Sequence, residues 1–355
     1  MKENSTLMIN HQRYTFDQGD TLLDVAKKNC ITIPTLCHLK DTMPTGACRL
    51  CQVEVKGSRD LMTACDTPAC EGMVIETESD KVIEARKQVI GMMLASGSHD
   101  CLLCYRNGTC ELQDLAVTYQ VDGSEFPHMP LNTDIEDVNP LIARDFSRCV
   151  LCGRCVKACN EVQVHDNLSF SNRGELPKIH AGLGDLTLKD SDCAFCGECI
   201  QACPTGALFE KKSRFAGKPW EQKTVRTTCP YCGVGCQLDL HINKDNKIVR
   251  VTGTENAQPN KGRTCVKGRF GYDFIYSDKR LTTPLIRKDG ELQPASWDKA
   301  LDLVANKFKQ IIHESGPDAL AGVSCARSTN EDSFQMQKLF RTVFGTNNID
   351  HCART

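Results

Sequence analysis

Two stretches of the sequence, RCVLCGRCVKACN at residues 148–160 and DCAFCGECIQACPTGAL at residues 192–208, are versions of one pattern. In each stretch three cysteines follow one another at three-residue steps, and a fourth comes four residues later. Three thiolates at such steps can surround one corner of an iron–sulfur cubane, which a tetrahedral zinc site does not require. The repeat therefore predicts a module that binds two [4Fe-4S] clusters.

This repeat resembles the bacterial two-cluster ferredoxins, in which the fourth cysteine of each run ligates the other cluster. Gly153 and Gly197 are expected to let backbone amides turn toward the cluster sulfurs. Asn160 stands where the second run has Pro204, which alters loop stiffness but removes no ligand. The resemblance implies a ferredoxin-like domain over residues 148–210. Its two ligand sets would be Cys149, Cys152, Cys155 and Cys203, and Cys193, Cys196, Cys199 and Cys159.

The composition of the whole chain agrees with metal and redox chemistry. The 355 residues include 23 cysteines, and the N-terminus has no export signal, so disulfides are a poor explanation for them. The 43 Lys and Arg residues nearly balance the 45 Asp and Glu residues, which argues against a nucleic-acid surface or a polybasic membrane patch. No apolar run approaches a membrane span, and we expect a soluble cytoplasmic protein of several domains.

Residues 1–80 have the pattern of a small mixed α/β domain, with two short alternating strands and a helix capped by Asp20 or Thr21. Its cysteines form a close pair with a distant fourth, as in plant-type [2Fe-2S] sites, although the first gap is ten residues instead of four. On spacing alone, zinc could also use four such thiolates. PTLC and CRLCQVEV resemble the β-grasp ferredoxin domain at the front of complex I's large iron–sulfur subunit. The candidate ligands are Cys37, Cys48, Cys51 and Cys65.

Residues 81–120 are expected to complete a helix over residues 79–96 and then to supply a further cluster segment. SHDCLLCYRNGTCELQDLA leaves a cubane one ligand short, because it contains three cysteines: Cys101, Cys104 and Cys110. The complex I family provides a histidine four residues before the first of these, where this sequence has Gly97. His99 is the candidate fourth ligand. Alternatively, it is an exposed loop histidine, and another residue, a water or nothing fills the fourth position.

Prolines and the lack of a sustained period predict a linker over residues 121–147, and a basic stretch predicts another over residues 211–225. The following domain, residues 226–282, resembles the [4Fe-4S] domain of the bis-pterin molybdenum or tungsten oxidoreductases. CPYCGVGC and CVKGRFGYDF are most similar to formate dehydrogenase, which implies that Lys267 lies between cluster and pterin; without the resemblance it is an ordinary surface lysine. The ligands would be Cys229, Cys232, Cys236 and Cys265.

Residues 283–355 have the pattern of the start of an α/β molybdopterin domain. Helices are expected over residues 297–314 and 331–344, with a buried strand in DALAGVSC between them. One or two strands cannot form a sheet that is covered on both faces, so this domain is expected to be incomplete. The four cysteines outside the ligand sets are interpreted as small apolar residues: Cys30, Cys70, Cys325 and Cys352.

The final stretch, ARSTNEDSFQMQKLFRTVFGTNNIDHCART, resembles the formate dehydrogenase segment that leads to the ligand of the active-site metal, commonly selenocysteine encoded by UGA. The resemblance implies that this residue follows Thr355 and that the chain is cut at a selenocysteine codon. A fragment boundary or a frameshift is the alternative. Cys352 lies four residues before the ligand position. We therefore expect no catalytic metal ligand within the chain, which by itself would carry electrons without turning over formate.

Together the resemblances imply an α+β multi-domain, electron-transferring portion of a formate dehydrogenase, a molybdopterin oxidoreductase. Formate oxidation or CO2 reduction would take place at a Mo- or W-bis-pterin guanine dinucleotide. One [2Fe-2S] and four [4Fe-4S] clusters would relay electrons to a flavin- and NAD(P)-binding iron–sulfur subunit, a ferredoxin or a hydrogenase subunit. The alternatives are the large iron–sulfur subunit of a complex I-type NADH dehydrogenase, an iron-only hydrogenase with the same front end, and a free-standing multi-cluster electron carrier.

Overall fold

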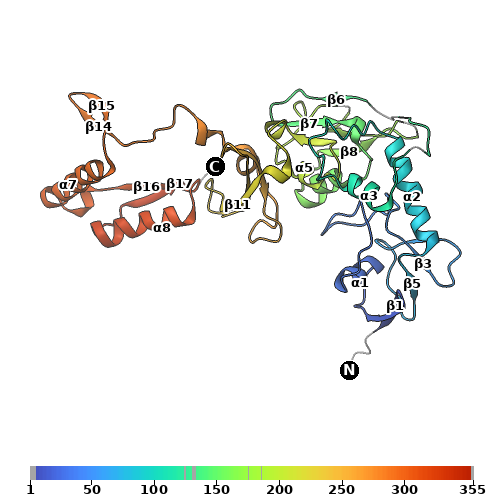
Figure 1. Cartoon of the computed structure of the whole chain (residues 1–355). Coiled ribbons are helices and arrows are strands. Elements are labelled where there is room, and N and C mark those ends of the chain that lie inside the picture. The colour runs from blue at the N-terminus through green and yellow to red at the C-terminus, as the bar shows by residue number, and fades with distance from the viewer. Residues whose placement is uncertain (1–4, 124, 130–132, 175, 185, 353–355) are drawn as a thin grey trace. The chain divides into compact units, whose positions relative to one another are not determined.

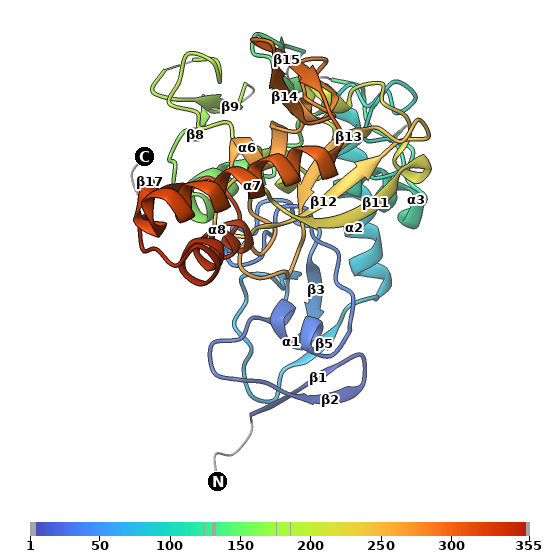
Figure 2. The same cartoon turned by 90° about the vertical axis from the view of Figure 1, so that its left-hand side faces the viewer.

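The computed structural model describes residues 5–123, 125–129, 133–174, 176–184 and 186–352. The chain forms two compact units, one of residues 1–222 with 243–245 and the other of residues 223–242 with 246–355. Figures 1 and 2 label the elements of both units. The end of the DHCART motif lies outside the described residues.

A five-stranded sheet of order β2-β1-β5-β3-β4 forms the front of the first unit. Strand β1 runs parallel to β5, and the other neighbouring strands are antiparallel. The first helix begins after Thr21, whose hydroxyl accepts a hydrogen bond from the Asp24 amide at 3.2 Å, so the predicted cap is confirmed at Thr21. The elements are β1 Thr6–Ile9, β2 Gln12–Thr15, α1 Leu22–Lys28, β3 Gln52–Val55, β4 Met62–Thr63 and β5 Val74–Glu76.

Two helices, α2 (Asp80–Ala95) and α3 (Glu111–Tyr119), follow the sheet. Ser79 caps α2, whose buried face carries the fully buried Arg86 among apolar residues. The guanidinium of Arg86 donates hydrogen bonds to the carbonyl oxygens of Leu50 and Gln52 at 3.1 and 2.9 Å. It also donates to the Tyr119 hydroxyl at 2.9 Å. A buried arginine thus ties the front sheet to both helices, which the apolar pattern of this helix did not predict.

The repeat of cysteines lies in a module built on a three-stranded sheet of order β10-β7-β6. Residues 121–147 were predicted to be a linker, but two strands of this sheet come from that segment. All four residues of β7 are buried, because the strand is central in the sheet. The elements are β6 Ile135–Glu136, β7 Ile142–Asp145, the 3-10 turn Phe146–Arg148, α4 Arg154–Lys157 continued by the π-helix Ala158–Val162, β8 Leu168–Ser171, β9 Lys178–Ala181, α5 Glu198–Ala202 and β10 Leu208–Glu210. Two further 3-10 turns, Lys211–Ser213 and Pro219–Glu221, follow β10.

The second unit begins with an antiparallel sheet of order β11-β12-β13 and the short helix α6. A hairpin of β14 and β15 leads to two helices and to a parallel pair of strands, β16 and β17. The elements are β11 Lys223–Thr228, β12 Gln237–Ile242, β13 Ile248–Gly253, α6 Val266–Phe270, the 3-10 turns Asp273–Tyr276 and Pro317–Ala319, β14 Leu285–Lys288, β15 Glu291–Pro294, α7 Trp297–Ser315, β16 Gly322–Cys325, α8 Asn330–Lys338 continued by the π-helix Leu339–Phe344, and β17 Ile349–Cys352.

Both helices predicted near the C-terminus are present, as α7 and α8 with its π-helical continuation. The strand predicted in DALAGVSC is not buried throughout, because Val323 on β16 is 78% exposed. Among the described residues, β16 pairs with β17 alone, and α7 contains no buried residue. The two-stranded sheet therefore leaves apolar side chains on its helices and strands in contact with solvent.

Candidate metal centres

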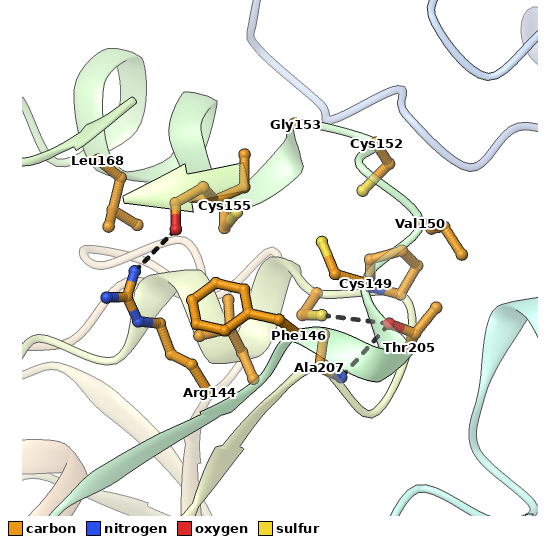
Figure 3. Close-up of a pocket in the computed structure, with 14 residues that line it drawn as sticks. Arg144, Phe146, Cys149, Val150, Cys152, Gly153, Cys155, Leu168, Thr205 and Ala207 are labelled. Carbon is orange, nitrogen blue, oxygen red and sulfur yellow. Dashed lines mark hydrogen bonds between the residues drawn. The ribbon is translucent and has the colours of Figure 1, made fainter. Parts of the chain in front are cut away.

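One cavity of the first unit gathers cysteines from both runs of the repeat. Three of its cysteines come from the first run and one, Cys203, comes from the second. Figure 3 shows Cys149, Cys152 and Cys155 together with Phe146 and Arg144, which also line the cavity. The remaining lining residues are largely apolar. The four cysteines are Cys149, Cys152, Cys155 and Cys203.

A second cavity has the reciprocal composition. Three of its cysteines come from the second run, and Cys159 comes from the first. The structure thus brings together each set of four that the ferredoxin resemblance implies, including the exchange of the fourth cysteine. The four cysteines of this cavity are Cys159, Cys193, Cys196 and Cys199.

The backbone explains how one run serves two cavities. Gly153 and Gly197 have left-handed conformations, with φ of 76° and 74°, and each is the residue immediately before a short helix. A residue without a Cβ adopts this conformation at little cost, so the loop can wrap around the first three cysteines. The helix then carries the fourth cysteine away to the neighbouring cavity.

The electrostatics of the first cavity favour a bound cationic centre. Burial raises the pKa of Cys149 to about 11, and burial with repulsion from neighbouring cysteines raises the pKa of Cys155 well above its usual value. Thiolates in such a space need positive charge, which the iron of a cluster supplies, since only the thiolate is a ligand. In the part of the chain that the structure describes, no group of three or more histidine, cysteine or carboxylate side chains is close enough to hold a single metal ion. The four cysteines and the largely apolar lining of each cavity fit a cluster with thiolate ligands.

The front domain buries its four cysteines in two close pairs. A hydrogen bond with the Cys48 side chain is the largest cause that lowers the pKa of Cys37 to about 5, and the Cys48 amide also donates to the Cys37 sulfur at 3.4 Å. Cys51 likewise lowers the pKa of Cys65. Gly46 has a φ of 58°, and a Cβ there would lie 2.5 Å from an Asp66 oxygen. Backbone donors and a glycine turn thus lie beside the four sulfurs that are the candidate ligands of this domain.

The third group of cysteines is less closely assembled. His99 lines a pocket with Cys101 and Cys110, and its Nε2 lies 3.0 Å from the Met93 carbonyl oxygen. Cys104 does not line this pocket, and its sulfur lies 2.6 Å from the position that a Cβ on Gly206 would take, but burial together with repulsion from Cys104 raises the pKa of both Cys101 and Cys110. The structure therefore brings His99 to two of the three cysteines while its Nε2 faces a backbone carbonyl.

A residue that sequence reasoning missed, His128, lies on the same pocket as His99. It is exposed, and it comes from the segment that was predicted to be a linker. The signal available in the sequence was a second histidine 18 residues after Cys110. Because the linker interpretation assigned no site to that segment, the histidine was not considered.

The second unit brings together the last group, with Cys229 and Cys236 at the two ends of the loop that joins β11 to β12. The Cys229 amide donates to the Cys236 carbonyl oxygen at 2.8 Å, and burial followed by repulsion from its neighbours raises the pKa of the Cys236 thiol. Its neighbours in that interaction are Cys229, Cys232 and Cys265. Cys265 precedes α6, and Lys267 on that helix is exposed. The surface position of Lys267 is the one expected without the family resemblance.

One apolar core joins three of the candidate centres. Leu36, Leu50, Ile90 and Leu112 form it together with Cys37 and Cys48 of the front domain. Cys110 and Cys152 pack against the same core. The front domain, the third group and the first run of the repeat therefore lie next to one another within the first unit.

The four remaining cysteines, which were interpreted as small apolar residues, are exposed or only partly buried. Cys30 and Cys70 are exposed. Cys325 and Cys352 lie opposite each other on the parallel strands β16 and β17, with their sulfurs 3.4 Å apart. Because each of these strands lies at the open edge of a two-stranded sheet, little apolar surface covers their sulfurs.

None of the helices in the described ranges is both long enough and apolar enough to cross a membrane.

Family models match the chain in consecutive segments. They are the 2Fe-2S iron-sulfur cluster binding domain at residues 2–80, the NADH-ubiquinone oxidoreductase-G iron-sulfur binding region at 86–125, the NADH-quinone oxidoreductase subunit 3 ferredoxin-like domain at 139–209, the molybdopterin oxidoreductase Fe4S4 domain at 222–277 and the molybdopterin oxidoreductase domain at 280–355.

Several proteins are similar to the chain over almost its whole length. NADPH-Fe(3+) oxidoreductase subunit alpha of Geobacter sulfurreducens is 39% identical over 98% of the chain and 40% of the relative. An NADH-quinone oxidoreductase subunit of Rhizobium meliloti is 36% identical over the same shares. A protein of Staphylococcus haemolyticus named "Putative formate dehydrogenase" is 32% identical over 100% of the chain and 39% of the relative. The chain thus spans about two fifths of the length of these relatives.

A solved structure is also similar to this chain. A chain of the crystal structure of NAD+-reducing [NiFe]-hydrogenase has a TM-score of 0.52 and 30% sequence identity, and the match covers 61% of this chain and 91% of that one. Iron–sulfur domains occupy the front of the sequence, and a molybdopterin domain begins behind them. The chain therefore joins an iron–sulfur front end of the NADH-ubiquinone oxidoreductase-G type to segments that match molybdopterin oxidoreductases.

Proposed function

We propose that the chain is the electron-transferring portion of a formate dehydrogenase, with one [2Fe-2S] and four [4Fe-4S] clusters held by the five cysteine groups. The formate-oxidising or CO2-reducing Mo- or W-pterin would be completed by sequence beyond the 355 residues. Electrons would leave to a flavin- and NAD(P)-binding iron–sulfur subunit, a ferredoxin or a hydrogenase subunit.

The observation that carries the proposal is the exchange of the fourth cysteine between the two cavities of the repeat. Cys203 lines the cavity of the first run, and Cys159 lines the cavity of the second. This arrangement serves two adjacent cubanes, and it gives no advantage to two independent zinc sites. Bound iron–sulfur clusters supply reversible one-electron transfer at each site.

The residues of the chain do three things for such centres. The Cys48 amide donates to the Cys37 sulfur, and such hydrogen bonds stabilise negative charge on the ligands. Apolar side chains such as Leu168 keep water away from the first cavity. The shared core of Leu36, Ile90 and Leu112 holds three groups next to one another.

Formate as the substrate is supported by the second unit. The formate dehydrogenase-like motif CPYCGVGC and the segment matched by the molybdopterin domain, residues 280–355, lie in this unit. The Staphylococcus haemolyticus relative matches along the entire chain. A complex I-type large subunit is the second candidate, because the Rhizobium meliloti relative matches 98% of the chain at a slightly higher identity.

An iron assay and a formate assay test the two parts of the proposal. The purified chain, reconstituted without oxygen, is expected to bind about 18 iron atoms, from one two-iron and four four-iron clusters. Stoichiometric zinc in any group would contradict the cluster assignment there. The longer protein that contains this chain is expected to reduce an artificial acceptor with formate, and acceptance of electrons from NADH without any formate activity would favour the complex I reading.

The predicted selenocysteine is tested at the level of the gene. Reading the codon that follows Thr355 decides it. A UGA followed by a long open frame supports the proposal, and a UAA or UAG with no open frame beyond it contradicts the selenocysteine prediction.

A further inference from the structure

A group of basic side chains lies between the front domain and the first run of the repeat. We name Lys27, Arg154 and Lys157 the junction cations. His38 directly follows Cys37, and its Nε2 lies 2.7 Å from the Lys27 amine. The Met43 amide, in the loop between Cys37 and Cys48, donates a hydrogen bond of 2.8 Å to Glu161, which lies one helical turn after Lys157. The helix that carries Lys157 therefore lies against the loop that joins two of the front cysteines.

The junction cations reach the cysteines on both sides. Lys27 lies on α1, whose Val25 and Ala26 share a core with Cys51 and Cys65 of the front group. On the other side, Arg154 directly precedes Cys155, which lines the first cavity of the repeat. Positive charge thus extends from one candidate centre to the next, within a single unit of the fold.

Lys157 is the member whose charge is least compensated. Lys157 is only 6% exposed, and among the described residues no hydrogen-bond acceptor lies within reach of its Nζ. Arg154, by contrast, forms an ion pair with Glu111 through two contacts of 2.7 and 2.8 Å. The nearby acid on the helix of Lys157 is Glu161, which accepts a hydrogen bond from the Met43 amide at 2.8 Å.

The geometry points to Lys157 as an electrostatic determinant of the centre held by the front group: its buried positive charge favours the reduced form and raises the reduction potential. This inference rests on the proposed cluster ligands of the front domain. Reduction adds one negative charge, and a cation stabilises it in proportion to its proximity and to the low local dielectric constant. Lys157 belongs to the four-iron module, so one module would set the potential of its neighbour.

The repeat supplies an internal comparison for this role. Lys157 lies two residues after the third cysteine of its run, and the matching position of the second run is Gln201. Substituting Lys157 by glutamine therefore places at this position a side chain that the same fold already accommodates. A unit charge about 10 Å away, at an effective dielectric constant of about 20, changes an equilibrium constant by more than tenfold.

The test is a reductive titration of the reconstituted chain, followed by electron paramagnetic resonance. The [2Fe-2S] signal persists at temperatures at which [4Fe-4S] signals are broadened away, so it can be followed separately. Lys157→Gln and Lys157→Met are expected to lower the ratio of reduced to oxidised [2Fe-2S] centre at a fixed potential at least tenfold, or about 59 mV for a one-electron couple. Lys157→Arg should leave the ratio unchanged, as should Lys56→Gln, which removes an exposed lysine of the front domain.

The outcomes separate this inference from the proposed function. A wild-type chain without a [2Fe-2S] signal contradicts the proposed ligands themselves. A normal wild-type signal whose potential is unchanged in both neutral variants overturns the role of Lys157. If neither neutral variant retains iron, Lys157→Arg decides: retained iron with an unchanged potential supports the charge, and loss of iron in this variant as well shows a packing role and contradicts the inference.

Discussion

The two runs of the repeat share a backbone and differ in charge. Both place a left-handed glycine before a short helix, and each sends its fourth cysteine to the other cavity. Between the shared cysteines, however, the first run has Arg154 and Lys157, where the second has Glu198 and Gln201. Ligand geometry therefore constrains the cysteines and glycines, while the positions between them are free to set the electrostatics of each centre.

The largest expected effect tests the exchange of cysteines. Cys203→Ser should remove the same resonance signal as Cys149→Ser and lower the iron content by about four atoms per chain, because both line the first cavity. Cys159→Ser should instead match Cys193→Ser. Iron analysis and low-temperature electron paramagnetic resonance measure both effects.

The exposed Cys70 provides the control, since Cys70→Ser should retain all the iron. If Cys203→Ser removed the same signal as Cys193→Ser, each run would bind its own cluster, and the exchange would be refuted.

Much of this arrangement could be predicted because it is local in the sequence. The step between cysteines, the glycines at 153 and 197 and the caps at Thr21 and Ser79 depend on neighbouring residues. The assignment of cysteines to a shared cavity came from the resemblance to two-cluster ferredoxins. The spacing of the cysteines within one run does not indicate which cavity the fourth cysteine lines.

The features that sequence reasoning missed depend on contacts far along the chain. Strand β7 was interpreted as linker because its partners, β6 and β10, are not visible in a four-residue pattern. Arg86 is a polar residue within the apolar pattern of its helix, and the carbonyl oxygens of Leu50 and Gln52, which satisfy its buried guanidinium, lie more than 30 residues away in the sequence. The sequence around Lys157 gives no signal of burial either, because lysines are usually exposed.

The next effect in size tests the shared backbone. Gly153→Ala should destabilise the first unit by about 1–2 kcal/mol, because a residue with a Cβ resists the left-handed conformation. The new Cβ would also lie 3.1 Å from Phe170, so the melting temperature should fall by several degrees in thermal unfolding.

Gly197→Ala is the matched variant, since its φ of 74° demands the same conformation. Two unchanged melting temperatures would show that neither loop needs a left-handed residue. A fall in one alone would show that the two runs differ in backbone strain as well as in charge.

A smaller effect concerns the attachment of the first run to α3. The ion pair of Arg154 with Glu111 is partly buried, with side-chain exposures of 14% and 42%. Its coupling energy is expected to be about 1 kcal/mol. Melting temperatures of Arg154→Gln, Glu111→Gln and the double variant measure this coupling, and strict additivity of the two single effects would show that the pair contributes nothing.

The smallest effect is expected from the reciprocal substitution, Gln201→Lys, which adds to the second run the charge that Lys157 gives the first. Gln201 is only partly buried, so solvent and salt should screen the new charge more strongly than they screen that of Lys157. The centre in the second cavity should become easier to reduce by less than the tenfold change expected at Lys157, and the shift should diminish as salt is added. Reductive titrations at two ionic strengths measure this. A shift as large as that of Lys157→Gln, and independent of salt, would contradict this prediction. It would show that the two positions do not differ in how strongly solvent screens their charges.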